Sequence, residues 1–215
     1  MMISPLIISC LLTGLAAILH YIDPPEIFEK KYLWRSMIIS FFNVLMLSNL
    51  EILIIDGQCP LFLIYAQIDK YSSLWLIISS IFYILTTDFL LWLTHYVLHN
   101  QYFYHYVHSF HHQVIHPTAF DFAAVHPIEL LMNWIMLHCI SCSIPIYQGT
   151  IMLYGGLMGI FPILEHGTGL RRFPLRKIYD PEFHNIHHRT KIYNYGVGPF
   201  APIWDYLFET TKKVR

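Results

Sequence analysis

The chain has 215 residues, of which 55% are apolar and 13% are charged, and its formal net charge is -1. A typical soluble domain has about 25% charged residues, so this composition excludes a disordered tail, a collagen-like chain and a disulfide scaffold. The near-neutral charge provides no electrostatic footprint for nucleic acid, which we do not expect as a partner.

Three stretches are long and apolar enough to predict membrane spans. A helix needs roughly 20 apolar residues to cross a bilayer core of about 30 Å. Residues 1–22, 36–55 and 72–93 meet this condition, although Glu51 interrupts the second stretch and Asp88 the third. The first stretch lacks the positively charged start of a cleaved secretory signal, so we interpret it as a span as well.

A fourth apolar region predicts a hairpin. No charged residue occurs between Glu129 and Glu165, a run of 35 residues. As one helix this run would be about 52 Å long, well beyond the thickness of a bilayer core. Pro145 and the Gln148–Gly149 pair near its middle predict a turn. The chain then returns to the side it left, which allows the segments before and after the hairpin to share a site.

The distribution of basic residues predicts the sidedness. The first loop carries three Lys and Arg residues, the second loop one, and the segment from Arg171 onward nine. The positive-inside rule therefore places the first loop and the C-terminal third in the cytosol, with the N-terminus outside. We predict an all-α integral-membrane helical bundle of three spans plus a hairpin, with a cytosolic histidine-rich helical cap.

Histidines are concentrated in one part of the chain, since 13 of the 14 lie between His95 and His188. Eight of them form three clusters with helical spacing: His95-x3-His99, His108-x2-His111-His112 and His184-x2-His187-His188. Side chains three and four apart are neighbours on a helix, so each cluster is expected to aim its nitrogens at one point.

Local signals predict helices around these clusters. The third apolar stretch continues into the first cluster, and Asn100 is expected to end this helix. Asp180-Pro181-Glu182 is typical of a helix start, with an N-cap carboxylate and a proline in the first turn. Asn194-Tyr195-Gly196 is typical of the turn that follows.

Eight clustered imidazoles predict two metal ions, because a structural zinc site takes four ligands. Nitrogen-rich ligation without thiolates suits zinc, copper, nickel or iron, and the spacing alone does not choose among them. A purely polar interfacial role is disfavoured, since imidazoles so close together repel one another when protonated.

The three clusters in this order resemble the fatty acid hydroxylase and sterol desaturase superfamily of integral-membrane di-iron oxygenases. The similarity covers about residues 75–210 and includes Asp88, His126-Pro127-Ile128-Glu129 and Trp204-Asp205-Tyr206-Leu207-Phe208. The family often has Arg where this chain has Tyr96 and Tyr206. The resemblance implies N-terminal spans and loops over residues 1–70 and a catalytic domain over residues 71–215.

The resemblance further implies two irons per chain, O2 as co-substrate, and hydroxylation or desaturation of a lipid, with a lean toward a sterol. It adds His166 to the eight clustered histidines, which gives nine candidate metal ligands: His95, His99, His108, His111, His112, His166, His184, His187 and His188.

Several other polar residues have two possible roles, one in the metal site and one in the structure. Asp88 lies on the helix face of His95 and His99, where it orients a ligand histidine or bonds another span. His126 is expected either to cap the hairpin helix or to lie near the metals. His105 and His116 are expected to lie around the site. For the remaining residues we expect a buried structural role for Cys139 and Cys142, and core or interfacial positions without a partner for His20 and His138.

A separate electron donor is expected, because the chain has no Gly-x-Gly-x-x-Gly turn and no haem-attachment motif. The family resemblance suggests a membrane cytochrome with its reductase, or a ferredoxin. It places a eukaryotic protein of this kind in the endoplasmic reticulum membrane and a bacterial one in the inner membrane.

Three alternative functions stay open. One is a fatty-acyl or sphingoid hydroxylase of the same superfamily. The second is a zinc-dependent membrane hydrolase, with Glu165 or Glu182 as its general base. The third is a metal-binding or metal-transport protein, which should carry metal-binding polar groups along its spans, where Glu51 and Asp88 alone make a poor path.

Overall fold

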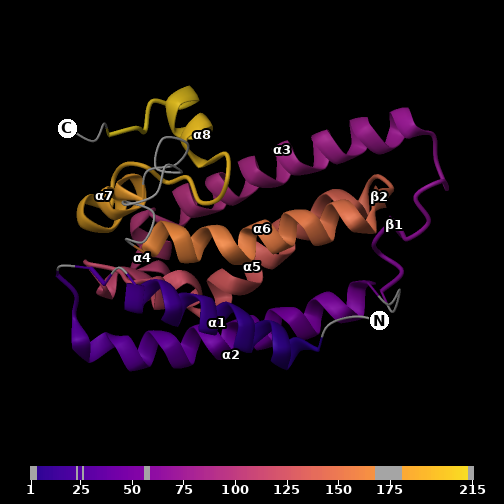
Figure 1. The fold of residues 1–215 in the computed structure, drawn as a ribbon. Coiled ribbons are helices and arrows are strands. Elements are labelled where there is room, and N and C mark those ends of the chain that lie inside the picture. Colours follow the sequence, from indigo (N-terminus) through magenta and orange to yellow (C-terminus); the bar gives the residue numbers. More distant parts are fainter. Residues whose placement is uncertain (1–3, 23, 26, 56–58, 168–180, 213–215) are drawn as a thin grey trace.

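The computed structural model describes residues 4–22, 24–25, 27–55, 59–167 and 181–212, and this part of the chain is mostly helical (Figure 1). The longer helices are α1 (Pro5–Ile22), α2 (Lys30–Ile55), α3 (Ser73–Leu98), α5 (Pro127–His138) and α6 (Gln148–His166). The short ones are α4 (Gln101–Tyr106), α7 (Glu182–Thr190), α8 (Ala201–Leu207) and the 3-10 helices η1 (His108–Gln113), η2 (Ala119–Ala123) and η3 (Cys139–Cys142).

Helices α1, α2 and α3 are long and apolar enough to cross a membrane, with 18, 26 and 26 residues. Large apolar side chains on their outer faces, such as Leu11, Phe42 and Ile81, are more than half exposed, as expected for contact with lipid. The predicted all-α fold class with three membrane-length helices is confirmed, and α2 begins six residues earlier than the sequence indicates, at Lys30.

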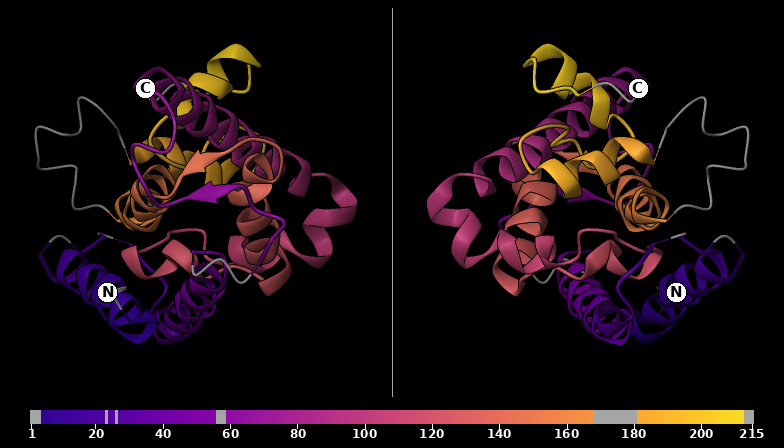
Figure 2. Two further views of the ribbon diagram at one scale, coloured as in Figure 1. Left: turned by 90° about the vertical axis from the view of Figure 1, so that its right-hand side faces the viewer. Right: turned by 90° about the vertical axis from the view of Figure 1, so that its left-hand side faces the viewer.

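Helices α5 and α6 form the predicted hairpin between the long helices. The chain turns between them through η3 and the short strand β2 (Ile146–Tyr147) at the end away from α7 (Figure 1). In this turn β2 pairs in parallel with β1 (Ile64–Tyr65), Ile64 opposite Ile146. Seen along the bundle, α5 and α6 lie between α3 on one side and α1 and α2 on the other (Figure 2).

Polar side chains on the inner face of α2 bind the segment after η1. Ser36 Oγ donates to Asp121 Oδ1 (2.5 Å), Ser40 Oγ to the carbonyl of Phe120 (2.8 Å), and Asn43 Nδ2 to the carbonyl of Ala123 (2.7 Å). Phe120 and its neighbours thereby seat η2 in an apolar core shared with α1, α2 and α6. The polar residues of α2 therefore attach the long helices to the end of the bundle that carries the histidines, which we call the cap end.

Two expectations about isolated residues are wrong. His138 is buried, but its Nε2 lies 2.8 Å from Oε2 of Glu51, so the residue joins α5 to α2 instead of lacking a partner. Cys139 is only partly buried and Cys142 is exposed, which rules out the expected buried role for the pair. For His20, the imidazole packs on the rings of Phe28 and Phe120, in keeping with a core position.

Candidate metal centre

Nine histidines gather at the cap end in two groups, and within each group the nearest ring nitrogens all lie within 4.8 Å of one another. Group one consists of His95, His99, His108, His112 and His187. Group two consists of His111, His166, His184 and His188. All nine candidate ligands from the sequence are therefore brought together, and all but His99 are buried.

The directions in which side chains leave a helix explain how histidines next to each other in the sequence join different groups. Residues four apart stay together, since His108 and His112 belong to group one and His184 and His188 to group two. In the two clusters of three, the middle member, His111 or His187, joins the other group, so these clusters do not aim at a single point as the spacing suggests, whereas His95 and His99 of the first cluster do share group one. Successive residues point about 100° apart on an α-helix and about 120° apart on a 3-10 helix such as η1, which separates adjacent histidines.

The local sequence determines these positions. Helix α3 ends at its cap residue His99, and Asn100 then caps α4, with its side chain accepting from the backbone N–H of Tyr102. The helix of the third cluster begins as expected near Pro181, which is its N-cap, while Asp180 lies outside the described residues. It ends at Lys191, which has a left-handed backbone conformation (φ 65°).

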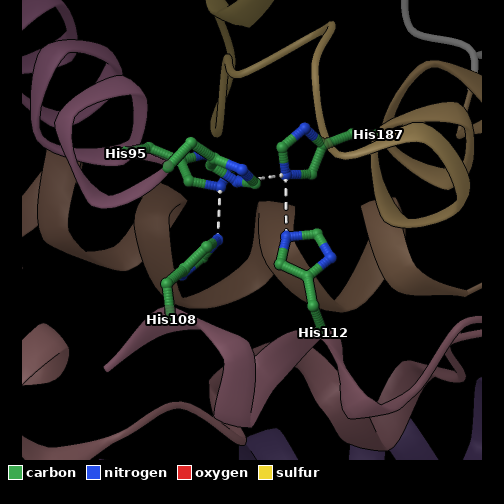
Figure 3. A group of neighbouring side chains, drawn as sticks. His95, His108, His112 and His187 are labelled. Carbon is green, nitrogen blue, oxygen red and sulfur yellow. Dashed lines mark hydrogen bonds between the residues drawn. The ribbon is translucent and has the colours of Figure 1, made fainter. Parts of the chain in front are cut away.

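The ring nitrogens approach one another closely. In group one, Nε2 of His95 lies 3.0 Å from Nε2 of His108, and Nε2 of His187 lies 3.1 Å from Nε2 of His112 (Figure 3). In group two, Nε2 of His184 lies 3.1 Å from that of His166 and 3.2 Å from that of His188.

The opposite ring nitrogens are bound to acceptors. Backbone carbonyls lie within 3.0 Å of Nδ1 in His95 (Tyr195, 2.6 Å), His187 (Tyr193, 2.7 Å), His166 (Pro162, 2.7 Å) and His188 (Val114, 3.0 Å). A carbonyl oxygen only accepts, so each of these Nδ1 atoms carries the hydrogen, and Nε2 of the neutral ring presents a lone pair.

Facing lone pairs at this distance repel each other unless a cation lies between them. Two imidazole nitrogens bound at 2.0–2.1 Å to one ion, at right angles or tetrahedral angles, lie about 2.9–3.4 Å apart. The observed Nε2 separations of 3.0 and 3.1 Å in group one and of 3.1 and 3.2 Å in group two fall in this range. The donor chemistry therefore fits a metal ion in each group.

Burial keeps these rings neutral, the form that binds metals. It lowers the pKa of His111 to about 4, and it lowers the pKa of His112, His184 and His187 well below the usual value of 6.5, with the neighbouring histidines adding to the effect for those three. At neutral pH these four rings, which come from both groups, therefore present unprotonated nitrogens.

The other polar residues singled out in the sequence lie outside the two groups. Asp88 accepts from the hydroxyl of Tyr154 in α6 (3.2 Å) and from Nε1 of Trp204 in α8 (3.1 Å), which is the contact to another helix. His126 caps α5, with Nδ1 accepting from the N–H of Ile128 (3.2 Å). For the last two histidines, His105 is exposed and His116 is partly exposed.

Two carboxylates support the site in a way that the sequence reasoning missed. Glu129 is buried, and its Oε2 lies 2.9 Å from Nδ1 of His108. Asp205 is buried and accepts hydrogen bonds from the backbone beside Tyr195. The signal was present, because both are acidic residues within the motif segments, but only the fold shows which groups they face.

Comparison with known proteins identifies the family. The model of the fatty acid hydroxylase family matches residues 80–210, more than half of the chain and a range that includes all nine histidines. The chain belongs to the fatty acid hydroxylase family. No solved structure matches it.

Several curated proteins are similar to this chain. A Delta(7)-sterol 5(6)-desaturase of Gibberella zeae is 32% identical over 62% of this chain and 42% of its own length. The lathosterol oxidase of Rattus norvegicus is 25% identical over 66% of this chain and 48% of its own length. A very-long-chain aldehyde decarbonylase of Oryza sativa is 29% identical over 57% of this chain and 21% of its own length. The chain thus spans less than half the length of these relatives.

Proposed function

We propose that this chain is a membrane-bound di-iron oxidoreductase that desaturates or hydroxylates a lipid, namely a sterol or a related molecule. The observation that carries the proposal is the pair of adjacent, buried, all-imidazole groups at one end of a membrane-length bundle. The names of the relatives, which include sterol desaturases and a lathosterol oxidase, support the substrate class.

The residues of this chain would hold, orient and shield the metals. When bound, two irons supply the activation of O2 that breaking an unactivated C–H bond requires. The nine histidines provide neutral nitrogen ligands, while carbonyls such as those of Tyr193 and Tyr195 hold the rings in one tautomer. Burial of the ligands excludes water from the reacting centre.

The position of the site suits a substrate that enters from the membrane. The ligands lie at the ends of α3 and α6 and on the short helices beyond them, so a lipid reaches the groups along the bundle (Figure 1). Desaturation removes two hydrogens from the lipid and reduces O2 to two waters, with two electrons and two protons supplied. Hydroxylation uses the same inputs and releases one water.

The two electrons require a separate donor, for which we propose a membrane cytochrome with its reductase or a ferredoxin. We further propose that the cap end faces the cytosol, in the endoplasmic reticulum membrane of a eukaryote or the inner membrane of a bacterium. The basic residues Lys30, Lys31 and Arg35 support this orientation, because they lie at the start of α2 beside the cap end.

A hydrolase is less well supported. Of its two candidate bases, Glu165 accepts from the backbone N–H of Gly198 (2.8 Å), and Glu182 forms an ion pair with Arg189. A transporter is also less well supported, since Glu51 pairs with His138 and Asp88 is held by Tyr154 and Trp204, so neither lines an ion path in the described structure.

The test combines metal analysis with lipid profiling. We expect wild-type protein purified in detergent to hold about two irons per chain, and a sterol-containing host that expresses it to accumulate an O2-dependent unsaturated or hydroxylated sterol. His187→Ala should abolish the product, whereas His20→Ala should retain it. A modified acyl chain in place of a sterol would support the fatty-acyl or sphingoid hydroxylase, and tightly bound zinc without any O2-dependent lipid product would contradict the oxidoreductase.

A further inference from the structure

The segment Tyr193–Thr210, which we call the C-terminal strap, contacts group one through its backbone. The carbonyl of Tyr195 accepts from Nδ1 of His95 (2.6 Å), and the carbonyl of Tyr193 accepts from Nδ1 of His187 (2.7 Å). The corresponding acceptors in group two are the carbonyls of Ala124, Pro162 and Val114, which lie outside the strap. Among these contacts between a backbone carbonyl and Nδ1 of a histidine, those from the strap are to group one alone.

Each of these carbonyls belongs to a peptide group whose N–H is also bound. The Tyr195–Gly196 peptide donates its N–H to Oδ2 of Asp205 (2.7 Å). The Tyr193–Asn194 peptide donates its N–H to the carbonyl of Thr210 (2.9 Å). A trans peptide group is planar with its N–H and C=O pointing in opposite directions, so an anchored N–H fixes the direction in which the carbonyl points. The two rings are therefore aimed by what holds the strap.

Asp205 is the centre of this anchorage. It is fully buried, and besides Gly196 it accepts from the backbone N–H of Tyr195 (2.9 Å) and the hydroxyl of Thr210 (2.5 Å). The backbone N–H of Thr210 in turn donates to the carbonyl of Asp205 (2.9 Å). One carboxylate thus joins both anchored peptides, and a hydrogen-bond chain of this kind strengthens each of its members.

We propose that Asp205 is a positioning residue that orients His95 and His187 for metal binding in group one, without itself touching the metal. This inference rests on the proposed metal centre. It goes further in making the two metal sites unequal, since the strap carbonyls that bind Nδ1 of ligand histidines reach group one, whereas the contacts of the strap beside group two are to Glu165 and to the backbone of Phe183.

The experiment measures metal content and affinity in purified full-length protein. Wild type is compared with Asp205→Ala and Thr210→Val, and with Glu209→Gln as a matched control, because Glu209 is an exposed acid in the same segment. Each protein is stripped with a chelator, reloaded with Fe²⁺ without oxygen, and analysed for bound metal. We expect two ions in wild type and Glu209→Gln, about one in Asp205→Ala, and two in Thr210→Val with the second bound at least several-fold more weakly.

Double variants identify which group loses its ion. Adding His187→Ala, in group one, to Asp205→Ala should leave the count at about one, because both changes empty the same group. Adding His184→Ala, in group two, should leave none. A merely structural role for Asp205 would instead reduce both groups together.

The outcomes separate this inference from the proposed function. Fewer than two ions in wild type would overturn both. Two tightly bound ions in wild type and also in Asp205→Ala would overturn the positioning role alone, and so would the loss of both ions in Asp205→Ala. If Asp205→Ala does not fold, Thr210→Val tests the proposal instead. An affinity for the second ion that equals the wild-type affinity in Thr210→Val would contradict the positioning role.

Discussion

Which ring nitrogen carries the hydrogen decides whether a histidine in this protein can bind a metal through Nε2. A carbonyl or carboxylate beside Nδ1 leaves Nε2 free to bind a metal, and His95, His108 and His187 all have such a partner. His108 differs from the other two because its partner is the carboxylate of Glu129, which fixes the orientation of the ring and strengthens its bond to a metal. Group one thus contains a carboxylate-backed histidine, whereas the Nδ1 contacts of group two are to carbonyls.

Substitution of Glu129 should therefore weaken one metal ion selectively. We expect Glu129→Ala to lower the affinity of group one by about 10- to 100-fold, the usual effect of removing the partner of a metal-binding histidine. Glu129→Gln, which can still accept through its amide oxygen, should lose less. Competition with a chelator measures both affinities, and equal weakening of the two ions would contradict this assignment.

The lowered histidine pKa values predict how pH affects the metal-free protein. Burial holds the pKa of His111 at about 4, while the same residue in the unfolded chain titrates near 6.5. Between these values the unfolded chain binds a proton that the folded chain does not, so the free energy of unfolding decreases as the pH falls through this window. His112, His184 and His188, whose pKa values are also lowered, act in the same direction.

Thermal unfolding in detergent tests this expectation. The metal-free protein should unfold at a lower temperature at pH 5 than at pH 7.5, and bound metal at pH 7.5 should raise the unfolding temperature, because metal binds only the folded form. An unfolding temperature of the metal-free protein that is independent of pH would show that the histidines are not buried as neutral rings.

At the scale of elements, polar residues inside α2 attach a span to the cap end. Asn43 Nδ2 donates to the carbonyl of Ala123 (2.7 Å), the last residue of η2, and to that of Val125 (3.0 Å), which follows η2. Asn49 also lies on α2 but is exposed, and it bonds only to the carbonyl of Leu45 in its own helix. Of these two side-chain amides on α2, only that of Asn43 joins the helix to another segment.

This contrast gives a matched pair of variants. Asn43→Leu leaves two carbonyls unsatisfied and should destabilise the protein by about 1–3 kcal/mol, whereas Asn49→Leu should be nearly neutral. Thermal unfolding in detergent compares the two. Equal effects would mean that the contact between α2 and the segment around η2 does not stabilise the fold.

At the scale of the whole molecule, the histidines and the β1–β2 pair lie at opposite ends of the bundle (Figure 1). At the cap end, Arg35 of α2 donates to the side chain of Gln113 in η1, so the basic first loop and the histidine groups share one side. The proposed sidedness therefore applies to the site as well as to the loop.

Thiol labelling in intact cells tests this arrangement. We expect Lys191→Cys, beside group one, to resist a membrane-impermeant reagent until the cytosolic face is opened, and Gln67→Cys, in the loop after β1, to react at once. Both positions are outside the long helices, Gln67 is exposed and Lys191 is partly exposed, and the native cysteines provide the baseline. The reverse pattern would place the cap outside the cytosol.

The amino-acid sequence by itself determined the features that depend on residue type and length. Apolar runs of sufficient length predicted the three membrane-length helices, and the uncharged run after Glu129 was too long for one crossing and therefore predicted the hairpin. The clustered histidines predicted eight candidate ligands, and the resemblance to a known family added His166. The length of an apolar run and the spacing of histidines are local properties of a segment and do not depend on how the segments pack together.

Only the tertiary structure decided how those residues are combined. It divides adjacent histidines such as His111 and His112 between two groups, turns Asp88 toward α6 and α8, and brings Glu129 and Asp205 behind the ligands of group one. Each of these contacts joins segments that are distant in the chain or follows from the direction of a side chain. Sequence spacing fixes neither, because both depend on how the helices pack.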